Sequence, residues 1–468
     1  MEMRTEQDSL GAVQVPASAW WGAQTQRAVE NFPVSGLRFP RVFVSALGMI
    51  KHACAEVNVE LGLLDAKLGR AIAEAAREVA EGKWDAEFPL DVFQTGSGTS
   101  MNMNANEVIS NLCNERLGGR RGEKKPVDPN DHVNRGQSSN DVIPTAAHLS
   151  VLLFFQRHLF PSLEGLRVSL ERKATEFAGI VKLGRTHLMD ATPVRLGQEF
   201  GGYARQMEKS LRDVRAASDA LLELAIGGTA TGTGINTPAD FGARVAAKLA
   251  QFSKIPVVEA KNHFEAQGAR DDLVLASGAL RRTACALKKI ANDVRWMGSG
   301  PLGGMGEILI PDLQPGSSIM PGKVNPVMSE VATQVAAQVV GNDVAVAFAG
   351  GDGAFELNVF IPVMVHNVLQ SALLLDSACR LFSEKCVDGI QANEARCRDL
   401  AEKSLMLVTA LNPIIGYDQA AKVAKEAYRR GVSVKQVALE QKLITADQAA
   451  ALFDLSKMTL PGATGAGG

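Results

Sequence analysis

The stretch LVLASGALRRTACALKKIANDV, residues 273–294, decides the fold. Apolar side chains recur in it at every seventh position, at Leu273, Leu280, Leu287 and Val294. The positions between them that support the same seam are Ala276, Ala284, Ile290 and Ala291. A seven-residue repeat of this kind is typical of a helix that packs into a bundle, and small alanines let neighbouring helix axes approach closely. The stretch therefore predicts one long helix of a helical bundle.

Two further stretches extend the helical prediction. Between residues 196 and 224, apolar side chains recur at steps of mostly three or four, and charged side chains lie off this stripe. The stripe consists of Leu196, Phe200, Tyr203, Met207, Leu211, Val214 and Leu221. Residues 357–375 carry no formal charge over nearly the length of a membrane span, but their Asn, Gln, His and Pro side chains would be unfavourable in lipid. We therefore expect 357–375 to be a helix buried inside the protein.

The composition supports a mainly helical class and argues against polyanionic partners. The 468 residues include 49 Lys and Arg against 51 Asp and Glu, so the net charge of -2 offers no basic surplus for nucleic acid or a membrane surface. Hydrophobic residues make up 46% of the chain but aromatic residues only 5%. Sandwiches and barrels usually use more aromatic and β-branched side chains, so this mixture favours packed helices.

The cysteines and the termini bear on the compartment. None of the six cysteines forms a CxxC pair or a Cys/His cluster with zinc spacing, so we expect reduced, mostly buried thiols. Residues 1–13 mix both charge signs without an apolar core, which is unlike a signal peptide. We therefore expect an intracellular, cytoplasmic protein with no membrane partner. The final residues, PGATGAGG at 461–468, are expected to be disordered.

Polar loops interrupt the predicted helices. They lie at residues 94–106, 127–141, 184–192, 227–237 and 315–326 and are rich in Gly, Ser, Thr, Asn and Pro. A rigid helical frame that carries polar loops is a common way to build a site. After about residue 393, short charged helices resume at 420–430 and 434–453, which indicates a small C-terminal unit.

The loop at 315–326 is the most informative of these. Its glycines and lysine do not fit a phosphate-binding loop, because the spacing from Gly316 to Gly322 is one residue too long and Val324 has no hydroxyl for magnesium. The glycines at 227–234 are an equally weak dinucleotide fingerprint. One interpretation is a flexible flap that brings Ser317 or Ser318 near Lys323, where glycine-rich backbone donors and an ammonium activate a hydroxyl. The alternative is a surface loop with turn-forming serines.

Three further groups are candidates for site residues. His187 is flanked by Arg185, Thr186 and Asp190, whereas the other six histidines have no such polar setting; the alternative for His187 is a packing residue. Two hydroxyl and amide clusters could each wrap a carboxylate with neutral donors, although helix capping would explain them too. The clusters are Ser97, Thr99 and Asn102, and Ser138, Ser139 and Asn140.

Taken in order, these motifs resemble one known superfamily. GSSIMPGKVNP at 316–326 is similar to the signature of the fumarase/aspartase superfamily. The resemblance covers nearly the whole chain, through VPASAWWGAQTQR, TGSGT, NMNANEV, GQSSND, GRTHLMDATP, GGTATGTGIN, KIANDVRWMGSGP, FELNVF and SLMLVTALNPIIGYD. Within the superfamily, GRTH with His187 and the segment 404–413 resemble the class II fumarate hydratases, whereas aspartate ammonia-lyases carry glutamine at the histidine position.

The resemblance implies a three-domain, mainly α fold. The expected domains are an N-terminal domain at 1–137, a central helical bundle at 138–392 and a small helical domain at 393–468. The central helices are expected to join those of three other copies in a twenty-helix core, giving a homotetramer with active sites shared between subunits. The implied partners are therefore a small dicarboxylate and further copies of the chain, without nucleic acid.

The resemblance also implies a reaction, the reversible hydration of fumarate to (S)-malate, without a metal or organic cofactor. Ser317 matches the catalytic base, and Lys323 and Asn325 match the residues that hold the substrate carboxylate and the dianionic intermediate. His187, polarised by Glu330, matches the group that acts through a water on the departing hydroxide. The positions that match substrate-binding residues are Ser97, Gly98, Thr99, Ser138, Ser139, Asn140, Thr186, Ser318 and Val324.

One segment departs from the family pattern. Many fumarases of this class have a second dicarboxylate site at a segment HPND, preceded by an arginine. In this chain the corresponding residues are Lys125, Asp128, Pro129, Asn130 and Asp131. Replacing an imidazole by a carboxylate repels an anion, so this second site is expected to be weak or absent. Two alternatives to fumarate hydration remain, an aspartate ammonia-lyase and a catalytically silent structural member of the superfamily.

Overall fold

The computed structural model describes residues 2–462, so residues 463–468 of the segment 461–468, which is predicted to be disordered, lie outside the described part. Within this range the chain is mainly α-helical, as predicted, with ten short strands that pair only two by two. It divides into two compact units. The first comprises the chain up to Pro161 together with Ser210–Ala284 and Val335–Asp376, and the second comprises Ser162–Lys209, Cys285–Gln334 and the chain from Ser377.

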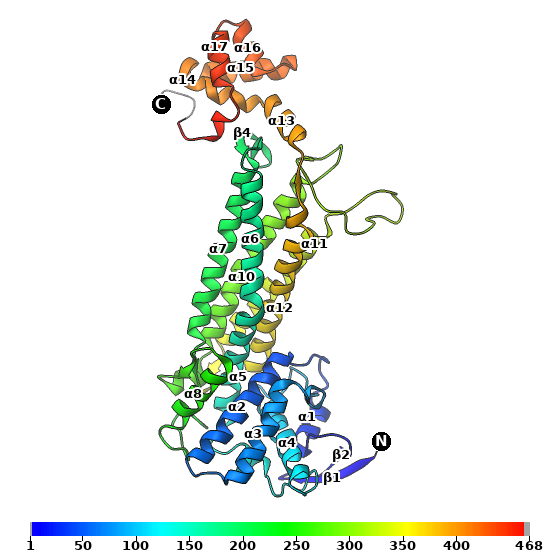
Figure 1. Ribbon diagram of the computed structural model, residues 1–468, viewed down its shortest axis with the longest axis vertical. Helices are drawn as coiled ribbons and strands as arrows, with labels where there is room; N and C mark the ends of the chain where they lie inside the picture. Colours follow the sequence, from blue (N-terminus) through cyan, green and yellow to red (C-terminus); the bar gives the residue numbers. More distant parts are fainter. Residues whose placement is uncertain (1, 463–468) are drawn as a thin grey trace. The chain divides into compact units, whose positions relative to one another are not determined.

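The first unit is built around helix α2. Its elements before the long helices are β1 (Met3–Asp8), β2 (Gly11–Pro16), α1 (Ala23–Asn31), α2 (Arg41–Glu60), α3 (Ala66–Glu81), α4 (Thr99–Arg116) and α5 (Ser139–Phe154). Helix α2 packs against α3 and α5, and Figure 1 shows α2 and α3 running side by side. The contact is close because Gly48 has no side chain, and a Cβ there would lie 2.5 Å from the backbone nitrogen of Ala80.

A buried carboxylate caps helix α1. Both oxygens of Glu107, on α4, accept hydrogen bonds from the α1 N-terminus: Oε2 from the backbone nitrogens of Gly22 (2.9 Å) and Thr25 (3.1 Å), and Oε1 from that of Gln24 (2.9 Å). The Thr25 hydroxyl donates a further bond of 2.6 Å. The carboxylate thus satisfies N–H groups that have no partner inside α1. This contact fixes α4, which begins at the polar loop 94–106.

Smaller elements complete the first unit. They are β5 (Glu223–Leu224), α8 (Phe241–Ser253), β6 (Val258–Glu259), α9 (His263–Gly268), β8 (Gly353–Ala354) and β9 (Leu357–Asn358). Strands β5 and β6 are parallel, and β8 and β9 are antiparallel. The loop 227–237 lies between β5 and α8.

Five long helices are divided between the units. They are α6 (Phe160–Glu176), α7 (Leu196–Ala220), α10 (Asp271–Met297), α11 (Val327–Gly350) and α12 (Ile361–Lys385). The heptad prediction is confirmed, because Leu273, Leu280, Leu287 and Val294 are all fully buried in α10. The predicted stripe of α7 is also buried throughout, although the helix ends at Ala220. A π-helical turn, Phe155–Leu159, connects α5 to α6.

The uncharged stretch 357–375 is mostly a buried helix, as predicted, but its first residues form strand β9 and the helix begins only at Ile361.

By length and hydropathy alone, α2 and α11 could cross a membrane. The apolar window of α2 is 78% buried in the core, which is usual for a core helix, whereas that of α11 is only 33% buried. Helix α11 therefore presents apolar side chains that this chain does not cover.

The second unit contains a hairpin and a small helical cluster. Strands β3 (Val181–Thr186) and β4 (Met189–Arg195) form the hairpin, and β7 (Ile308–Leu309) pairs with β10 (Gln391–Ala392). The cluster comprises α13 (Glu394–Lys403), a 3₁₀ segment (Leu405–Leu411), α14 (Asn412–Ile415), α15 (Tyr417–Arg430), α16 (Val434–Glu440) and α17 (Ala446–Leu452). The predicted helix at 434–453 is wrong in detail. It is two helices, separated by a turn where Lys442 has φ +55° and Thr445 caps α17.

All six cysteines are free thiols. Five are buried, as expected, and Cys285 is exposed. Within residues 2–462, no group of three or more His, Cys, Asp or Glu side chains is arranged to hold a metal ion.

Candidate active site

The first unit joins the two predicted hydroxyl clusters into one. Gly98 adopts φ +73° directly before α4, and the Ser97 and Thr99 hydroxyl oxygens lie 2.8 Å apart. The Thr99 hydroxyl also lies 2.8 Å from that of Ser139, at the start of α5. Residues 40 positions apart in the sequence therefore form a continuous chain of neutral donors. Such a chain can bind a carboxylate without a formal charge of its own.

The N-terminus of α5 is held by buried contacts. The backbone nitrogen of Ser138 donates to Asp141 Oδ1 (2.9 Å), and Asp141 Oδ2 accepts from the nitrogens of Gly227 (3.1 Å) and Thr229 (2.9 Å). Burial raises the pKa of Asp141 to about 6. The Ser138 hydroxyl accepts from the backbone nitrogen of Asn140 (3.2 Å), so helix capping describes Ser138 correctly. Asp141 links the loop 227–237 to the hydroxyl cluster.

A cavity of about 770 Å³ lies against this cluster. Thr99, Ser138 and Ser139 line it, together with Asn130 and Asp131 of the predicted second site. Asp128 Oδ1 accepts from the backbone nitrogens of Asn130 (2.7 Å) and Asp131 (2.9 Å) and caps a π-helical turn that begins at Pro129. Lys125 is exposed. The weakness of the second site stays a prediction.

His187 lies at the tip of the β3–β4 hairpin. Thr186 pairs with Met189, and the two residues between them, His187 and Leu188, have φ of +56° and +60°. Left-handed backbone at both central positions is a hairpin geometry that usually employs Gly or Asn, so it is unfavourable for these residues. His187 is exposed. Packing within one copy of the chain therefore does not account for His187, and its role stays a prediction.

A buried ion cluster anchors the base of this hairpin. Glu307 is fully buried, and both of its oxygens accept from Arg185 Nη1 at 2.9 Å. Lys182 Nζ lies 3.2 Å from Glu307 and 3.0 Å from Glu199. Burial raises the pKa of Glu199. Arg185 is two residues before His187, so the cluster holds the strand that leads into the turn carrying the imidazole.

The loop 315–326 is closed by its own polar contacts. The backbone nitrogen of Gly316 donates to the carbonyl of Lys323 (2.8 Å), and Asn325 Nδ2 donates to the carbonyl of Gly316 (2.8 Å). Lys323 Nζ donates to Asn325 Oδ1 (2.5 Å). The Ser317 oxygen accepts from the backbone nitrogens of Ile319 (3.2 Å) and Met320 (2.9 Å). These donors would stabilise an alkoxide, and they also make a local turn, so both interpretations of the serine fit the geometry.

The remaining predicted residues surround this loop or the hairpin. Ser318 and Val324 are exposed on the loop, Thr186 is exposed on β3, and Glu330 lies half-buried in the first turn of α11. Among the described residues of the second unit, no hydrogen bond or ion pair joins the hairpin to the loop. The predicted residues thus form one group in the first unit and two groups in the second.

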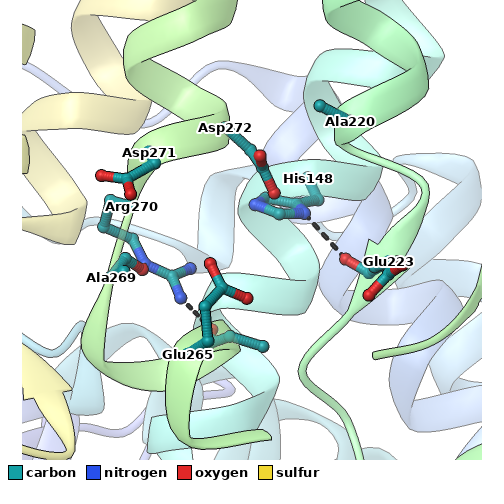
Figure 2. Close-up of a pocket in the computed structure, with 9 residues that line it drawn as sticks. His148, Ala220, Glu223, Glu265, Ala269, Arg270, Asp271 and Asp272 are labelled. Atoms are coloured by element: carbon teal, nitrogen blue, oxygen red, sulfur yellow. Dashed lines mark hydrogen bonds between the residues drawn. The ribbon is translucent and has the colours of Figure 1, made fainter. Parts of the chain in front are cut away.

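The expectation that no other histidine has a polar setting is wrong for His148. It is buried on α5 and lines a cavity of about 260 Å³ with Glu265, Arg270 and Asp272, and Figure 2 shows these side chains around the cavity. Its Nδ1 lies 3.0 Å from the carbonyl of Glu223. Burial lowers the pKa of His148 to about 3 and raises that of Asp272 to about 6. The sequence could not reveal this cluster, because its members are up to 124 positions apart, from His148 to Asp272.

Comparison with known proteins defines the class. A family model described as lyase matches residues 11–341, and a model described as fumarase C C-terminus matches residues 407–460. The chain is therefore a member of the lyase family, and its C-terminal part matches the model described as fumarase C C-terminus.

Individual relatives narrow the class further. The class II fumarate hydratase of Corynebacterium glutamicum is 57% identical over 448 residues, which cover 96% of this chain and 93% of the relative. That of Nitrosomonas europaea is 53% identical over 458 residues, covering 98% and 99%. The crystal structure of recombinant class II fumarase from Schistosoma mansoni matches with a TM-score of 0.96 at 38% identity, covering 98% of this chain and all of that one. The chain belongs to the class II fumarate hydratase family, which confirms the resemblance and the fold class.

Proposed function

We propose that this protein catalyses the reversible hydration of fumarate to (S)-malate. The observation that carries the proposal is the closed loop 315–326, where one hydroxyl oxygen accepts two backbone hydrogen bonds close in sequence to a lysine and an asparagine. The reaction is the one that the names of the curated relatives state. The histidine of the GRTH motif supports hydration over deamination, because loss of ammonia needs no water activated by an imidazole.

The chemistry assigns each group a role. In the direction from malate, Ser317 removes the proton on C3, and the negative charge spreads into the adjacent carboxylate. The backbone donors of Ile319 and Met320 stabilise the serine oxyanion, while Lys323 and Asn325 bind the dianion. Lys323 and Asn325 now bond to each other, so the substrate carboxylate takes the place of that contact.

The other groups serve the hydroxide and the far carboxylate. His187 donates a proton through a water to the departing hydroxide, with Glu330 polarising the imidazole. The exposure of His187 leaves room for that water. The neutral donors of the first unit bind the substrate carboxylates; they are Ser97, Gly98, Thr99, Ser138, Ser139 and Asn140, and Thr186 and Ser318 of the second unit add to them. No metal or organic cofactor takes part in this scheme.

We further propose that four copies assemble, sharing their active sites. Helix α11 supports this proposal, since Glu330 and Asp343 are its only charged residues. Val344 and Phe348 on this helix are 66% and 73% exposed, and they line an apolar groove of about 600 Å³. An uncovered apolar strip of this kind marks a contact between proteins. The central domain at 138–392 and its flanking domains remain the proposed division of each copy.

The compartment and the second site are also proposals. The cytoplasm is the proposed location, supported by six free thiols, which persist in a reducing environment. The second dicarboxylate site is proposed to be weak or absent, because Asp128 puts a carboxylate where the HPND segment of the family has an imidazole. Calorimetric titration with a dicarboxylate inhibitor is expected to give one site per chain, and two comparable sites would contradict this.

The proposed reaction is tested by following the ultraviolet absorbance of fumarate. We expect Ser317→Ala and His187→Asn each to lower kcat by roughly 10²- to 10⁴-fold, the usual effect of acid–base groups. The matched control is His158→Asn, an exposed histidine in the first unit, which is expected to leave kcat unchanged. Near-normal rates in both site variants would refute the mechanism. Turnover of L-aspartate without turnover of L-malate would establish the ammonia-lyase instead, and inactivity toward both would favour the silent structural member.

A further inference from the structure

A fully buried lysine lies behind the hydroxyl cluster. Lys51, on α2, is 0% exposed, and apolar and small residues make up most of the sequence on either side of it. Its ammonium donates three hydrogen bonds, to Asn102 Oδ1 at 2.7 Å, Asn134 Oδ1 at 3.0 Å and Gln137 Oε1 at 2.8 Å. Asn102 belongs to the first turn of α4, and the other two belong to the loop that precedes α5. One side chain therefore connects both segments that carry the hydroxyl cluster.

The three bonds determine how the amides are oriented. An ammonium has three donors and no acceptor, so each amide must turn its oxygen toward Lys51 and its nitrogen away. The freed nitrogens then continue the network, because Asn102 Nδ2 donates to Asn134 Oδ1 (3.2 Å) and Asn134 Nδ2 donates to the carbonyl of Gln137 (3.1 Å). The carbonyl of Gln137 immediately precedes Ser138. The lysine thus fixes the backbone from which α5 begins.

The same amides border the candidate site. Asn102, Asn134 and Gln137 line the 770 Å³ cavity together with Thr99 and Ser138. Lys51 itself does not line it, so the lysine is one residue removed from any ligand there. Its influence on a ligand must pass through the orientation of the amides and of the loop.

Burial of this charge is unfavourable unless it is compensated. Burial lowers the pKa of Lys51 to about 7, and the ionisable groups that act on it are Asp141 and the Cys54 thiol. Burial raises the pKa of Cys54, so Asp141 is the counter-charge. A buried methionine would fill similar space without a desolvation penalty. A lysine at this position therefore serves something other than packing.

We propose that Lys51 is a positioning residue, which orients Asn102, Asn134 and Gln137 so that the Thr99–Ser139 hydroxyl cluster can bind a substrate carboxylate. The inference rests on the proposed function, since it names a residue that shapes the same site. It assigns no contact between Lys51 and the substrate.

The test is Lys51→Met, with Lys173→Met as the matched control. Lys173 is also buried, but it belongs to the second unit and donates to the carbonyl of Ile390 (2.7 Å) and to Glu176 (2.8 Å). We expect Lys51→Met to raise KM for fumarate about tenfold or more, because it leaves the amide oxygens of Asn102 and Gln137 without a donor. Asn134 Oδ1 loses one donor but keeps Asn102 Nδ2. We expect kcat to change less than threefold, and the control to leave KM unchanged.

The pH dependence separates positioning from general loss of structure. In the wild type, KM is expected to rise as the pH increases through about 7, because the Lys51 ammonium loses a proton and a donor. Lys51→Met is expected to lack this change, whereas Lys173→Met retains it. An unchanged pH profile of KM in a folded Lys51→Met variant would refute the proposal.

Two further measurements keep the outcome decisive. If Lys51→Met does not fold, Gln137→Met removes one acceptor while keeping the ammonium, and it is expected to raise KM severalfold; an unchanged KM refutes the inference. Calorimetric binding of succinate is measured in parallel. A wild type that binds succinate but does not hydrate fumarate would refute the proposed function, whereas equal succinate affinities of wild type and Lys51→Met would refute the role of Lys51.

Discussion

Replacing Glu307 by glutamine tests how the His187 hairpin is held. The substitution keeps the shape of the side chain but removes the charge that faces Arg185 Nη1 at 2.9 Å and Lys182 Nζ at 3.2 Å. Lys182 keeps Glu199 at 3.0 Å, so Arg185 is the cation left without a carboxylate. Removing one partner of a buried ion pair destabilises a protein by about 3–5 kcal/mol. We expect Glu307→Gln to lower the free energy of unfolding by that amount.

The Glu307→Gln substitution should also lower the catalytic rate. Arg185 lies two residues before His187, and misplacement of a catalytic group by about 1 Å can reduce a rate by about 10²-fold. We therefore expect kcat for fumarate hydration to fall by about 10- to 100-fold in Glu307→Gln. The KM is expected to change less, because the hydroxyl cluster belongs to the other unit.

A double-mutant cycle with Arg185→Met isolates the pair. Once both partners are removed, the remaining charges of the cluster, Lys182 and Glu199, are paired with each other. The double variant should therefore be less destabilised than the sum of the single variants, with a coupling energy of about 1–3 kcal/mol. Urea unfolding followed by circular dichroism at one protein concentration measures the stabilities. Glu171→Gln, in an exposed pair with Arg167, is the control and should cost less than about 1 kcal/mol. Strictly additive losses would refute the reasoning.

Three other outcomes are expected. The pKa of His148 is about 3 in the fold against an ordinary value of 6.5, so the unfolded chain binds more protons and stability falls as the pH drops from about 6.5 toward 3. The raised pKa of Asp272, about 6, acts in the opposite sense, favouring the fold at low pH and losing that effect as the pH rises through about 6. His148→Gln should therefore flatten the acid limb of a stability–pH curve measured by urea unfolding, and a slope equal to that of the wild type would contradict this. Gly98→Ala should lower stability by about 1–3 kcal/mol and raise KM, because its φ is +73° and the new Cβ would lie 2.7 Å from a neighbouring side chain; thermal unfolding and kinetics check this. Val344→Glu should yield species smaller than a tetramer in light scattering with loss of activity, and a full-size active assembly would oppose the proposed use of α11.

Periodicity predicted the long helices well, because the spacing of apolar residues within one helix is enough to indicate which face of that helix is buried. The heptad of α10 marks its own buried side through Leu280 and Leu287, whatever packs against it. Breaks in helices were predicted less well. The turn between α16 and α17 depends on Lys442 at φ +55°. Lysine rarely adopts this backbone conformation, so its presence in the sequence does not predict a turn.

The site was predictable in part, and for a different reason. Its residues were found through a family resemblance carried by motifs, and their catalytic roles stay predictions. What the sequence could not indicate is which distant residues meet, because neither Lys51 with Gln137 nor His148 with Asp272 shares a motif or a period. A lone lysine inside the apolar stretch of α2 was the one available signal for the buried network.

The exposed apolar side chains of α11, Val344 and Phe348, affect how the newly made protein assembles. In the proposed assembly, a newly synthesised chain carries Val344 and Phe348 exposed to water until other copies cover them. With the assembly proposed above, that covering is a reaction between separate molecules, so its rate falls steeply at low expression. Between release from the ribosome and assembly, the same strip is available to any other apolar surface. Recovery of activity after dilution from denaturant should therefore depend on chain concentration. In the cell, the yield of active protein should be limited by chaperone capacity before it is limited by the stability of the folded chain.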